Sequence, residues 1–363
     1  MKLEQIQFVH FRNHGSLTFA PSGGINLIYG PNGSGKTSIL EGIHYCALTK
    51  GFVSAYDIEC LKEGHLFFLL KGRFASESGT ETEVKVSYSR QAGKQLTVNT
   101  LNLASFSSHI GAIPCITFSP SELSIITGSP AERRRFLDNA ICQTNRRYLD
   151  ALLSYRRILQ QRNALLFQIR EHRSGMEMLD ILTEQLAEHA VCIVRSRMQF
   201  IREIMPVAEA HLVAVSAGET PRIAYRCSFL PHDCTESSDQ LSRLFEERIR
   251  EKRQEEIARA QTAIGPHRDD LLFFLNEKEV KRYASQGQKR SFLITLKLAL
   301  YRYFLEKLDE QPICLFDDLF SELDRERVDS LLLLLSGFGQ TIITTTEKRN
   351  TPGVSALNIC EIA

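Results

Sequence analysis

The sequence lacks the features that would place it among zinc-binding, secreted or membrane-spanning proteins. Its 9 cysteines are scattered, and no two of them have the C-x-x-C spacing that is typical of a zinc site. No apolar run approaches the ~20 residues that span a bilayer, and residues 1–5 contain no apolar segment of a secretory signal. We therefore expect a cytoplasmic protein with reduced thiols and no membrane partner.

Net charge is also almost absent. Lys and Arg number 44 against 43 Asp and Glu, so the formal net charge is only +1. This balance by itself predicts no nucleic-acid partner, and the distribution of the charges matters more. The sequence has no internal repeat and no low-complexity linker. Its hydrophobic fraction of 43% over 363 residues is enough for a sizeable core in one large domain or two.

The sequence does contain a phosphate-binding motif near its start. Residues 30–37 have the form G-x-x-x-x-G-K-[ST], in which glycines let backbone N–H groups point at a polyphosphate. We expect Lys36 to reach the β- and γ-phosphates and to assist catalysis, and Thr37 to ligate Mg²⁺ through its hydroxyl. The nucleotide ligands expected from this segment are Gly30, Pro31, Asn32, Gly33, Ser34, Gly35, Lys36, Thr37 and Ser38.

The residues on either side of the motif favour a nucleotide site. Residues 25–29 form a short apolar run of the kind found in a buried strand. Ile39, Leu40 and Ile43 follow at helical spacing, so a helix N-terminus would face the bound anion. The alternative is a glycine-rich turn that joins a strand to a helix and binds nothing.

Strand patterns and helix patterns occupy different parts of the chain. Val84 and Val86 alternate with polar neighbours at the period of a half-buried strand. Leu179, Leu182 and Leu186 recur at the spacing of one helix face. Strand-like runs return towards the C-terminal end.

The simplest organisation is an α/β fold with a helical insertion. We predict a nucleotide-binding lobe with a mixed sheet, built from residues 1–130 and 262–363. A mainly helical lobe of residues 131–261 would be inserted into it.

An acidic pair is expected to complete the magnesium site. Residues 313–316 read as a buried strand that ends in Asp317 and Asp318. We expect Asp317 to hold Mg²⁺, directly or through water, and Asp318 to polarise the attacking water as the catalytic base. The alternative is a strand end whose acids only cap the following helix.

A second helix end could also receive a phosphate. Ser285, Gln286, Gly287 and Gln288 open a long apolar-faced helix, with Ser285 as its natural N-cap. A serine and a glycine there offer a hydroxyl, a backbone N–H and the positive end of the helix dipole. The alternative is that these residues do nothing beyond capping.

These motifs, in this order, resemble those of ATP-binding-cassette ATPases. In that superfamily the second helix end is the signature motif, which completes the ATP site of a partner subunit. Ser285 to Gln288 resemble the signature, and Asp317 and Asp318 resemble the acidic strand end. Ser321 and Asp324 would belong to the dimer-contacting D-loop, by the same resemblance.

A narrower match is to the RecF family of bacterial recombination mediators. The segments that resemble it are 11–14 (Phe-Arg-Asn-His), 128–138, 161–163, 265–271, 285–290 and 316–324. The resemblance implies a nucleoid-associated ATPase head without a long coiled coil, which uses ATP and Mg²⁺ and forms a homodimer with ATP. It also implies binding of duplex DNA or a single/double-strand junction, cooperation with RecR and RecO, and loading of RecA at gaps.

Three segments of the chain bear on how closely the site would follow this family. Arg12 and Asn13 would lie beside the ATP phosphates, with a solvated loop arginine as the alternative for Arg12. The family usually has Pro-Glu-Asp-Leu where residues 120–123 read Pro-Ser-Glu-Leu, so Glu122 would have to serve alone. The strand at 341–345 has no switch histidine after it, which leaves Thr345 or Thr346 as the γ-phosphate sensor.

Arginines concentrate in the region expected to be helical. The candidates for contact with DNA phosphates are Arg133, Arg134, Arg146 and Arg147. The alternative is a solvated helix surface on which they pair with glutamates. No aromatic-basic repeat indicates base stacking, so duplex or junction DNA is favoured over bare single strands.

The resulting hypothesis is a slow, DNA-stimulated ATPase of recombinational repair whose ATP-bound dimer closes on DNA. The alternative is a structural tether, like the chromosome-maintenance proteins, that uses ATP only to hold the dimer. An ATPase-linked nuclease would need a further acidic metal cluster. Asp269 and Asp270 are the one candidate, and the adjacent Arg268 favours a structural role for them.

Overall fold

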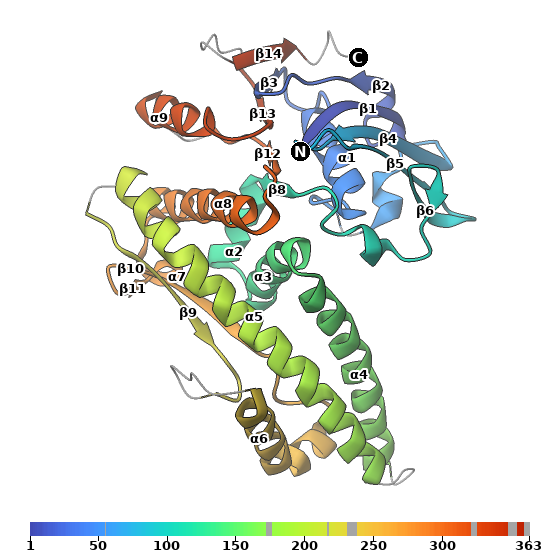
Figure 1. Cartoon of the computed structure of the whole chain (residues 1–363), viewed down its shortest axis with the longest axis vertical. Coiled ribbons are helices and arrows are strands. Elements are labelled where there is room, and N and C mark those ends of the chain that lie inside the picture. Colours follow the sequence, from blue (N-terminus) through green and yellow to red (C-terminus); the bar gives the residue numbers. More distant parts are fainter. Residues whose placement is uncertain are drawn as a thin grey trace. The chain divides into compact units, whose positions relative to one another are not determined.

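The chain folds into two compact units. The computed structural model describes residues 1–54, 56–171, 176–215, 218–230, 238–320, 325–347 and 354–358 (Figure 1). Unit 1 contains Met1–Leu123 and Ile294–Ala363, and unit 2 contains Ser124–Leu293. The α/β class with a mainly helical insertion is therefore confirmed.

The second boundary of the insertion differs from the expected one. The sequence indicated a return to the nucleotide-binding lobe at residue 262, whereas the contacts keep the chain in unit 2 as far as Leu293. The physical reason is strand pairing, because β10 (Asp270–Leu275) pairs antiparallel with β9 (Pro221–Arg226) along its whole length. The strand-like run after 262 thus completes a small sheet of the insertion.

Unit 1 contains two sheets of different kinds. The strands of the 6-stranded antiparallel sheet, in spatial order, are β2 (His14–Phe19), β1 (Lys2–Phe11), β4 (Phe67–Ala75), β5 (Glu81–Ser89), β6 (Gly93–Val98) and β7 (Leu101–Asn102). Those of the 5-stranded parallel sheet are β14 (Val354–Asn358), β3 (Ile25–Tyr29), β13 (Thr341–Thr345), β12 (Ile313–Phe316) and β8 (Cys115–Phe118). Strands of both orientations are present, as expected, but they are divided between two sheets.

Burial follows the sequence pattern of each sheet. Strands β12 and β13 are buried at every residue, which matches their continuous apolar or β-branched sequence. Buried and more exposed residues alternate along much of β1, as in a sheet with one solvated face. Helix α1 (Lys36–Leu48) contacts strands of both sheets, and the core of unit 1 forms around it.

The rest of unit 1 consists of 3₁₀ turns and of helices from the C-terminal part of the chain. The remaining elements are the 3₁₀ turns η1 (Asp57–Cys60), η2 (Phe106–His109) and η3 (Pro120–Leu123), the helix α9 (Arg325–Leu335), and most of α8 (Gln286–Leu308). The hydroxyl oxygen of Tyr301 in α8 accepts the N–H of Gly339 at 2.8 Å. Its ring also stacks on Phe338 at 3.7 Å, which fixes α8 against the turn before β13.

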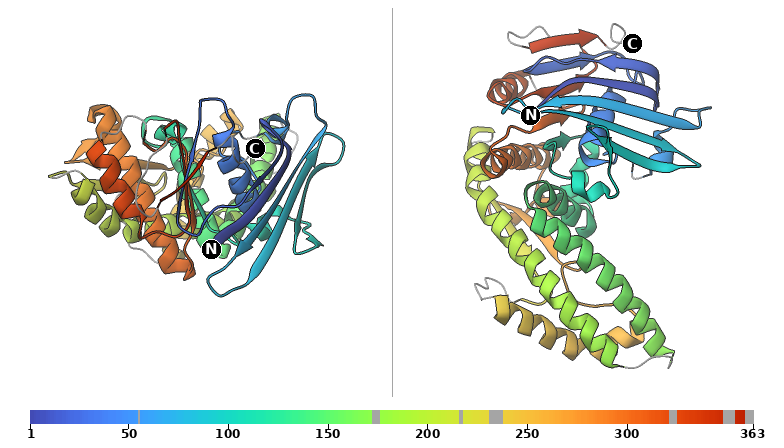
Figure 2. Two further views of the ribbon diagram at one scale, coloured as in Figure 1. Left: turned by 90° about the horizontal axis from the view of Figure 1, so that it is seen from above. Right: turned by 45° about the vertical axis from the view of Figure 1, so that its right-hand side comes forward.

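Unit 2 is mainly helical. Its helices are α2 (Ser124–Thr127), α3 (Pro130–Thr144), α4 (Arg146–Arg170), α5 (Glu177–Val215), α6 (Ser238–Arg259) and α7 (Val280–Tyr283). A 3-stranded sheet in the order β11 (Lys278–Glu279), β10, β9 accompanies them. Figure 2 shows α4 and α5 side by side along much of their length. Within the described part of the chain, no helix is long and apolar enough to cross a membrane.

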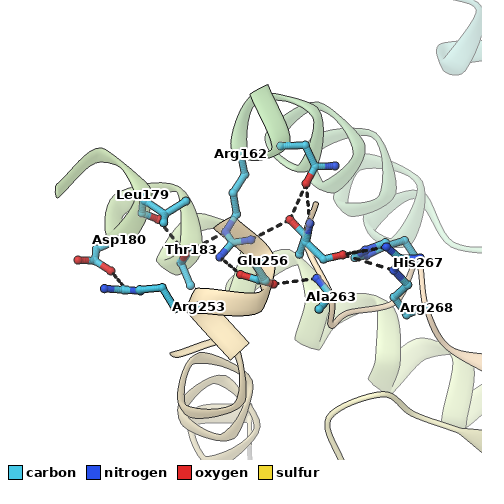
Figure 3. Close-up of polar contacts among 11 residues, drawn as sticks. Arg162, Leu179, Asp180, Thr183, Arg253, Glu256, Ala263, His267 and Arg268 are labelled. Carbon is cyan, nitrogen blue, oxygen red and sulfur yellow. Dashed lines mark hydrogen bonds and ion pairs between the residues drawn. The ribbon is translucent and has the colours of Figure 1, made fainter. Parts of the chain in front are cut away.

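A buried ion pair joins three helices of unit 2 (Figure 3). Arg162 of α4 and Glu256 of α6 have no exposed side-chain surface, and their Nη2 and Oε2 atoms are 2.6 Å apart. Arg162 also donates to the hydroxyls of Thr183 at 3.0 Å and Thr262 at 2.8 Å. Because breaking such a pair leaves an uncompensated charge in the core, we assign Arg162 a structural role.

Candidate nucleotide-binding site

The phosphate-binding loop has the local conformation that its glycines predict. It connects β3 to α1, so the N-terminus of α1 opens directly onto the loop. Gly33 has φ 79° and Gly35 has φ 95°, both in the left-handed region that side chains other than glycine rarely adopt. A Cβ at Gly35 would also lie 2.7 Å from the ring of His14, so glycine is required there for two reasons.

A cavity of about 320 Å³ lies over this loop in unit 1. Its walls come from the loop, the end of β12, the end of β13 and the turn after β8. The lining residues are Asn13, Asn32, Gly33, Gly35, Lys36, Thr37, Ser38, Pro120, Asp317, Asp318, Thr344, Thr345 and Thr346. The structure therefore brings the loop and the acidic pair, which are far apart in the sequence, to one place.

Two hydroxyls converge on one oxygen of Asp317. Thr37 donates its hydroxyl to Asp317 Oδ1 at 2.8 Å, and Thr344 donates to the same oxygen at 2.6 Å. A carboxylate beside a threonine hydroxyl is the kind of hard oxygen donor set that suits Mg²⁺, which keeps several waters as its other ligands. Thr37 and Asp317 could therefore hold this ion.

The side chain of Lys36 folds back over the phosphate-binding loop. Its Nζ donates to the carbonyls of Gly30 at 2.8 Å and Pro31 at 2.7 Å. Burial lowers the pKa of Lys36, and the nearby Asp317 and Asp318 act in the opposite direction. An ammonium has three hydrogens, so the two loop bonds leave one to be directed at a phosphate in the cavity.

Asp318 occupies an unusual backbone conformation at the edge of the cavity. Its φ of 48° is left-handed, which aspartate tolerates better than most residues. Its N–H donates to the hydroxyl oxygen of Thr344 at 3.0 Å. The Thr344 hydroxyl thus donates its hydrogen to the Asp317 carboxylate and accepts the backbone N–H of Asp318 through its oxygen.

Thr344 is a site residue that the sequence did not single out. It is the fourth residue of β13 and is nearly fully buried. The sequence of residues 341–345 indicates a strand rich in β-branched residues. It does not indicate that this strand pairs with β12. Thr345 and Thr346, the expected sensors, both line the cavity, and the Thr345 hydroxyl accepts the N–H of Glu347 at 3.3 Å.

In this structure the Arg12 side chain is directed to α1 and not into the cavity. Arg12 makes a bidentate pair with Glu41 of α1, with bonds of 2.7 and 2.8 Å to the two carboxylate oxygens. It also donates to the carbonyl of Glu59 at 2.7 Å, and it does not line the cavity. Glu41 is nearly fully buried, so its charge draws the guanidinium towards α1. Asn13 does line the cavity and donates to the carbonyl of Gly33 at 3.0 Å.

Glu122 does not lie in the cavity either. Its Oε1 accepts from Lys297 Nζ at 2.6 Å, and its Oε2 accepts the N–H of Ser119 at 3.0 Å. Lys297 is buried and needs a counter-charge, which Glu122 supplies. In residues 120–123, the residue that does line the cavity is Pro120.

The signature segment begins α8 with a reciprocal cap. The Ser285 N–H donates to Gln288 Oε1 at 2.8 Å, and the Gln288 N–H donates to Ser285 Oγ at 3.2 Å. This is a capping box with glutamine at its fourth position, so the N-cap prediction for Ser285 is confirmed. Ser285 and Gly287 are exposed, and the segment belongs to unit 2 rather than to the nucleotide-binding lobe expected for it. The D-loop residues Ser321 and Asp324 lie outside the described residues.

The four arginines proposed for DNA have different environments. Arg133 is buried and makes a bidentate pair with Asp270, at 2.7 and 3.1 Å, so it is not available to a phosphate and its assignment was wrong. Arg134 is half-buried and donates to the carbonyl of Asp269 at 2.7 Å. Arg146 and Arg147 are exposed.

Asp269 and Asp270 are structural residues. Asp269 is fully buried and accepts from the Tyr225 hydroxyl at 2.5 Å and the Ser228 N–H at 2.7 Å. Burial raises its pKa, while these two donors and Arg197 lower it. Among the described residues, no group of three or more His, Cys, Asp or Glu side chains could hold a metal ion.

Fold and cavity together define a phosphate-loop domain of the kind found in the heads of Smc proteins. The Smc head bound to the C-winged helix domain of ScpA has the same fold, with a TM-score of 0.57, 15% identity, and coverage of 96% of this chain and 90% of that one. The AAA domain family matches residues 5–311.

More similar proteins narrow this class to one family. The DNA replication and repair protein RecF of Chlorobium limicola is 61% identical over 361 residues, which cover 99% of each chain. A solved structure of the recombination mediator protein RecF with ATP, in the RecFOR pathway, superposes with a TM-score of 0.93 at 30% identity, and 98% of this chain and 95% of that chain are covered. The chain belongs to the RecF family.

Proposed function

We propose that this chain is an ATP-dependent DNA-binding protein of recombinational repair. The observation that carries the proposal is the arrangement around Asp317, where the Thr37 and Thr344 hydroxyls meet one carboxylate oxygen beside the phosphate-binding loop. A RecF relative of this fold has been solved with ATP, which supports ATP as the nucleotide.

In this proposal each residue of the cavity has a separate task. The loop N–H groups and Lys36 hold the phosphates, and Thr37 and Asp317 hold Mg²⁺, which would neutralise charge on the β- and γ-phosphates. Asp318 polarises the attacking water. Thr345 or Thr346 senses the γ-phosphate, since both face the cavity.

The site is proposed to be completed by a second copy of the chain. Ser285 and Gly287 of one subunit would close over the γ-phosphate held by the other, so the ATP-bound form is an isologous dimer. Loss of the γ-phosphate would then loosen the dimer, and hydrolysis would time its release from DNA. The exposure of Ser285 and Gly287 at the start of α8 supports this role.

Partners are proposed from family membership. Relatives carry the name of a DNA replication and repair protein, and the solved relative is a recombination mediator protein in the RecFOR pathway. We propose that this chain binds duplex or junction DNA and acts with RecR and RecO in loading RecA at gaps. Arg146 and Arg147 are the remaining exposed candidates for phosphate contacts.

Sedimentation of the protein with and without ATP, Mg²⁺ and duplex DNA tests this proposal. We expect a monomer without nucleotide and a dimer with ATP that DNA stabilises further. Lys36→Ala should weaken nucleotide binding at least tenfold, because the cation facing the phosphates is lost. A wild-type protein that binds ATP yet stays monomeric would refute the dimer, and unchanged affinity in Lys36→Ala would refute the role of Lys36.

A structural tether that uses ATP only to hold the dimer is the second candidate. The observation that favours it is Asp318, whose backbone N–H is held by Thr344 and whose short side chain reaches a water less well than a glutamate would. In the ATPase proposal turnover is slow and DNA-stimulated, and a DNA-free rate near the enzyme median of about 10 s⁻¹ would contradict it. If Asp318→Asn dimerises and supports repeated rounds of RecA loading, the tether is correct.

A further inference from the structure

We infer that His14 is a positioning residue that holds the phosphate-binding loop in its nucleotide-binding conformation before the nucleotide arrives. The inference rests on the proposed nucleotide-binding function of the cavity. It concerns the short turn between β1 and β2, in which Arg12 holds α1 and Asn13 holds the carbonyl of Gly33.

The His14 side chain contacts the last glycine of the loop. Its imidazole is buried, and its Nε2 lies 3.0 Å from the carbonyl oxygen of Gly35. The same oxygen accepts the N–H of Ile39, the first bond of α1, at the longer distance of 3.3 Å. His14 therefore ties the loop to the first turn of the helix.

The position of this carbonyl decides where the next N–H points. In a trans peptide the C=O and the following N–H point in opposite directions. With the Gly35 oxygen fixed on the side of His14, the N–H of Lys36 is directed the other way, as the first helical N–H groups must be to meet an anion. Gly35 and Lys36 both line the cavity, in agreement with this orientation.

The chemistry of the contact requires one tautomer of His14. A carbonyl oxygen can only accept, so the Nε2 nitrogen must carry the hydrogen and donate it. Burial lowers the pKa of His14, its bond to Gly35 raises it, and Lys62 lowers it further. The net lowering keeps the ring neutral at pH 7 without removing the hydrogen on Nε2.

The structure offers a matched control in His109. This histidine is also buried in unit 1, and its Nε2 lies 2.8 Å from the carbonyl of Cys46, near the opposite end of α1. Burial lowers its pKa as well. Removal of either ring should destabilise α1, but only His14 contacts the loop.

The test compares His14→Ala, His14→Gln and His109→Ala. Binding of a fluorescent ADP analogue gives the affinity, and hydrogen–deuterium exchange of the nucleotide-free protein reports on the loop amides at residues 33–37. We expect His14→Ala to weaken binding about three- to tenfold, the effect of one lost hydrogen bond, and to speed exchange in the loop. Glutamine places an amide N–H the same number of bonds from Cβ, so His14→Gln should restore both values to within about twofold. His109→Ala should change neither.

His14→Phe separates the hydrogen bond from packing, since it keeps an aromatic ring beside Phe8, whose centroid is 5.8 Å from that of His14. If His14→Ala does not fold, His14→Phe should still show the weaker binding and the faster exchange. Wild-type affinity and exchange in a folded His14→Ala or His14→Phe would overturn the inference. A wild-type protein that binds no nucleotide would refute the proposed function instead, and the exchange of the loop amides would still decide the role of His14.

Discussion

Thr344 of β13 and Asp317, the residue directly after β12, are joined by a hydrogen bond of 2.6 Å, and the two strands are adjacent in the parallel sheet. The bond fixes the carboxylate that also accepts from Thr37. The Thr344 hydroxyl oxygen also accepts the backbone N–H of Asp318, so one hydroxyl contacts the carboxylate of the first acid and the backbone of the second. This threonine should matter for catalysis although it need not touch the nucleotide.

We predict that Thr344→Val lowers Mg²⁺-dependent ATP hydrolysis about tenfold or more, the usual effect of losing a residue that orients a metal ligand. Nucleotide binding without Mg²⁺ should change little, because the loop is intact. Thr341→Val is the matched control. It lies in the same strand, is fully buried, and donates to the carbonyl of Gly339 at 3.2 Å, away from both acids. Equal rates in Thr344→Val and wild type would contradict the orienting role.

We predict that Ser285→Arg abolishes ATP-dependent dimerisation while ATP still binds, because a bulky cation would occupy the place of the partner's γ-phosphate. Gly287→Ala is a smaller change in the same signature segment. A Cβ at Gly287 would come no closer than 4.0 Å to its nearest neighbour, the Ser285 Oγ, so the chain itself has room for it. A dimer that still forms with ATP in the Ser285→Arg protein, measured by sedimentation velocity, would exclude the site in trans.

We predict that Arg146→Ala combined with Arg147→Ala weakens duplex binding for all sequences alike. Each phosphate contact contributes about 0.9 to the slope of log affinity against log salt, so the slope should fall by up to about 2. Arg222→Ala is a suitable control, since Arg222 is exposed and paired with Glu277 on another element of unit 2. Binding titrations between 50 and 200 mM salt measure both values, and an unchanged slope would place the DNA contacts elsewhere.

We predict that the protein loses stability as the pH falls below about 6.5. Burial lowers the pKa of His267 to about 4, although its bond to the Thr262 carbonyl acts the other way. The folded state therefore excludes a proton that the unfolded chain takes up below pH 6.5. At pH 5, about 1.5 units below the pKa of an unfolded histidine, this group lowers the free energy of unfolding by about 2 kcal/mol.

His267→Gln supplies the control for this pH effect. It removes the titrating group, so its unfolding free energy should change less between pH 7 and pH 5 than that of the wild type. The substitution itself is destabilising at pH 7, because His267 accepts from the Tyr155 hydroxyl at 2.6 Å. Identical pH profiles for the two proteins, measured by thermal melts, would exclude His267 as the source.

The parts of the site that the sequence predicted are local. The loop is one contiguous segment with a fixed spacing, and Asp317 and Asp318 directly follow an apolar strand. The Ser285 cap is equally local, since its partner Gln288 is three residues away. Each of these could be read without knowing which strands are neighbours.

What the sequence could not provide depends on long-range pairing. Thr344 reaches Asp317 only because β13 lies next to β12, and Arg12 turns to α1 only because Glu41 is buried there. The sequence suggested that Arg133 is a surface cation, whereas it is buried and paired with Asp270, a residue far along the chain. The late boundary at Leu293 has the same origin, in the pairing of β9 with β10.

The cap at the start of α8 has a chemical consequence for recognition. The Ser285 hydroxyl oxygen accepts the N–H of Gln288. Among the contacts of the described residues, the hydrogen of this hydroxyl is not donated to any acceptor. A serine can therefore stabilise its own helix and still present a proton to a foreign oxygen. Capping and anion recognition, which looked like alternatives in the sequence, are compatible in one side chain. A binding surface of this kind needs no rearrangement when its anion arrives, because its geometry is already set by the folding of its own helix.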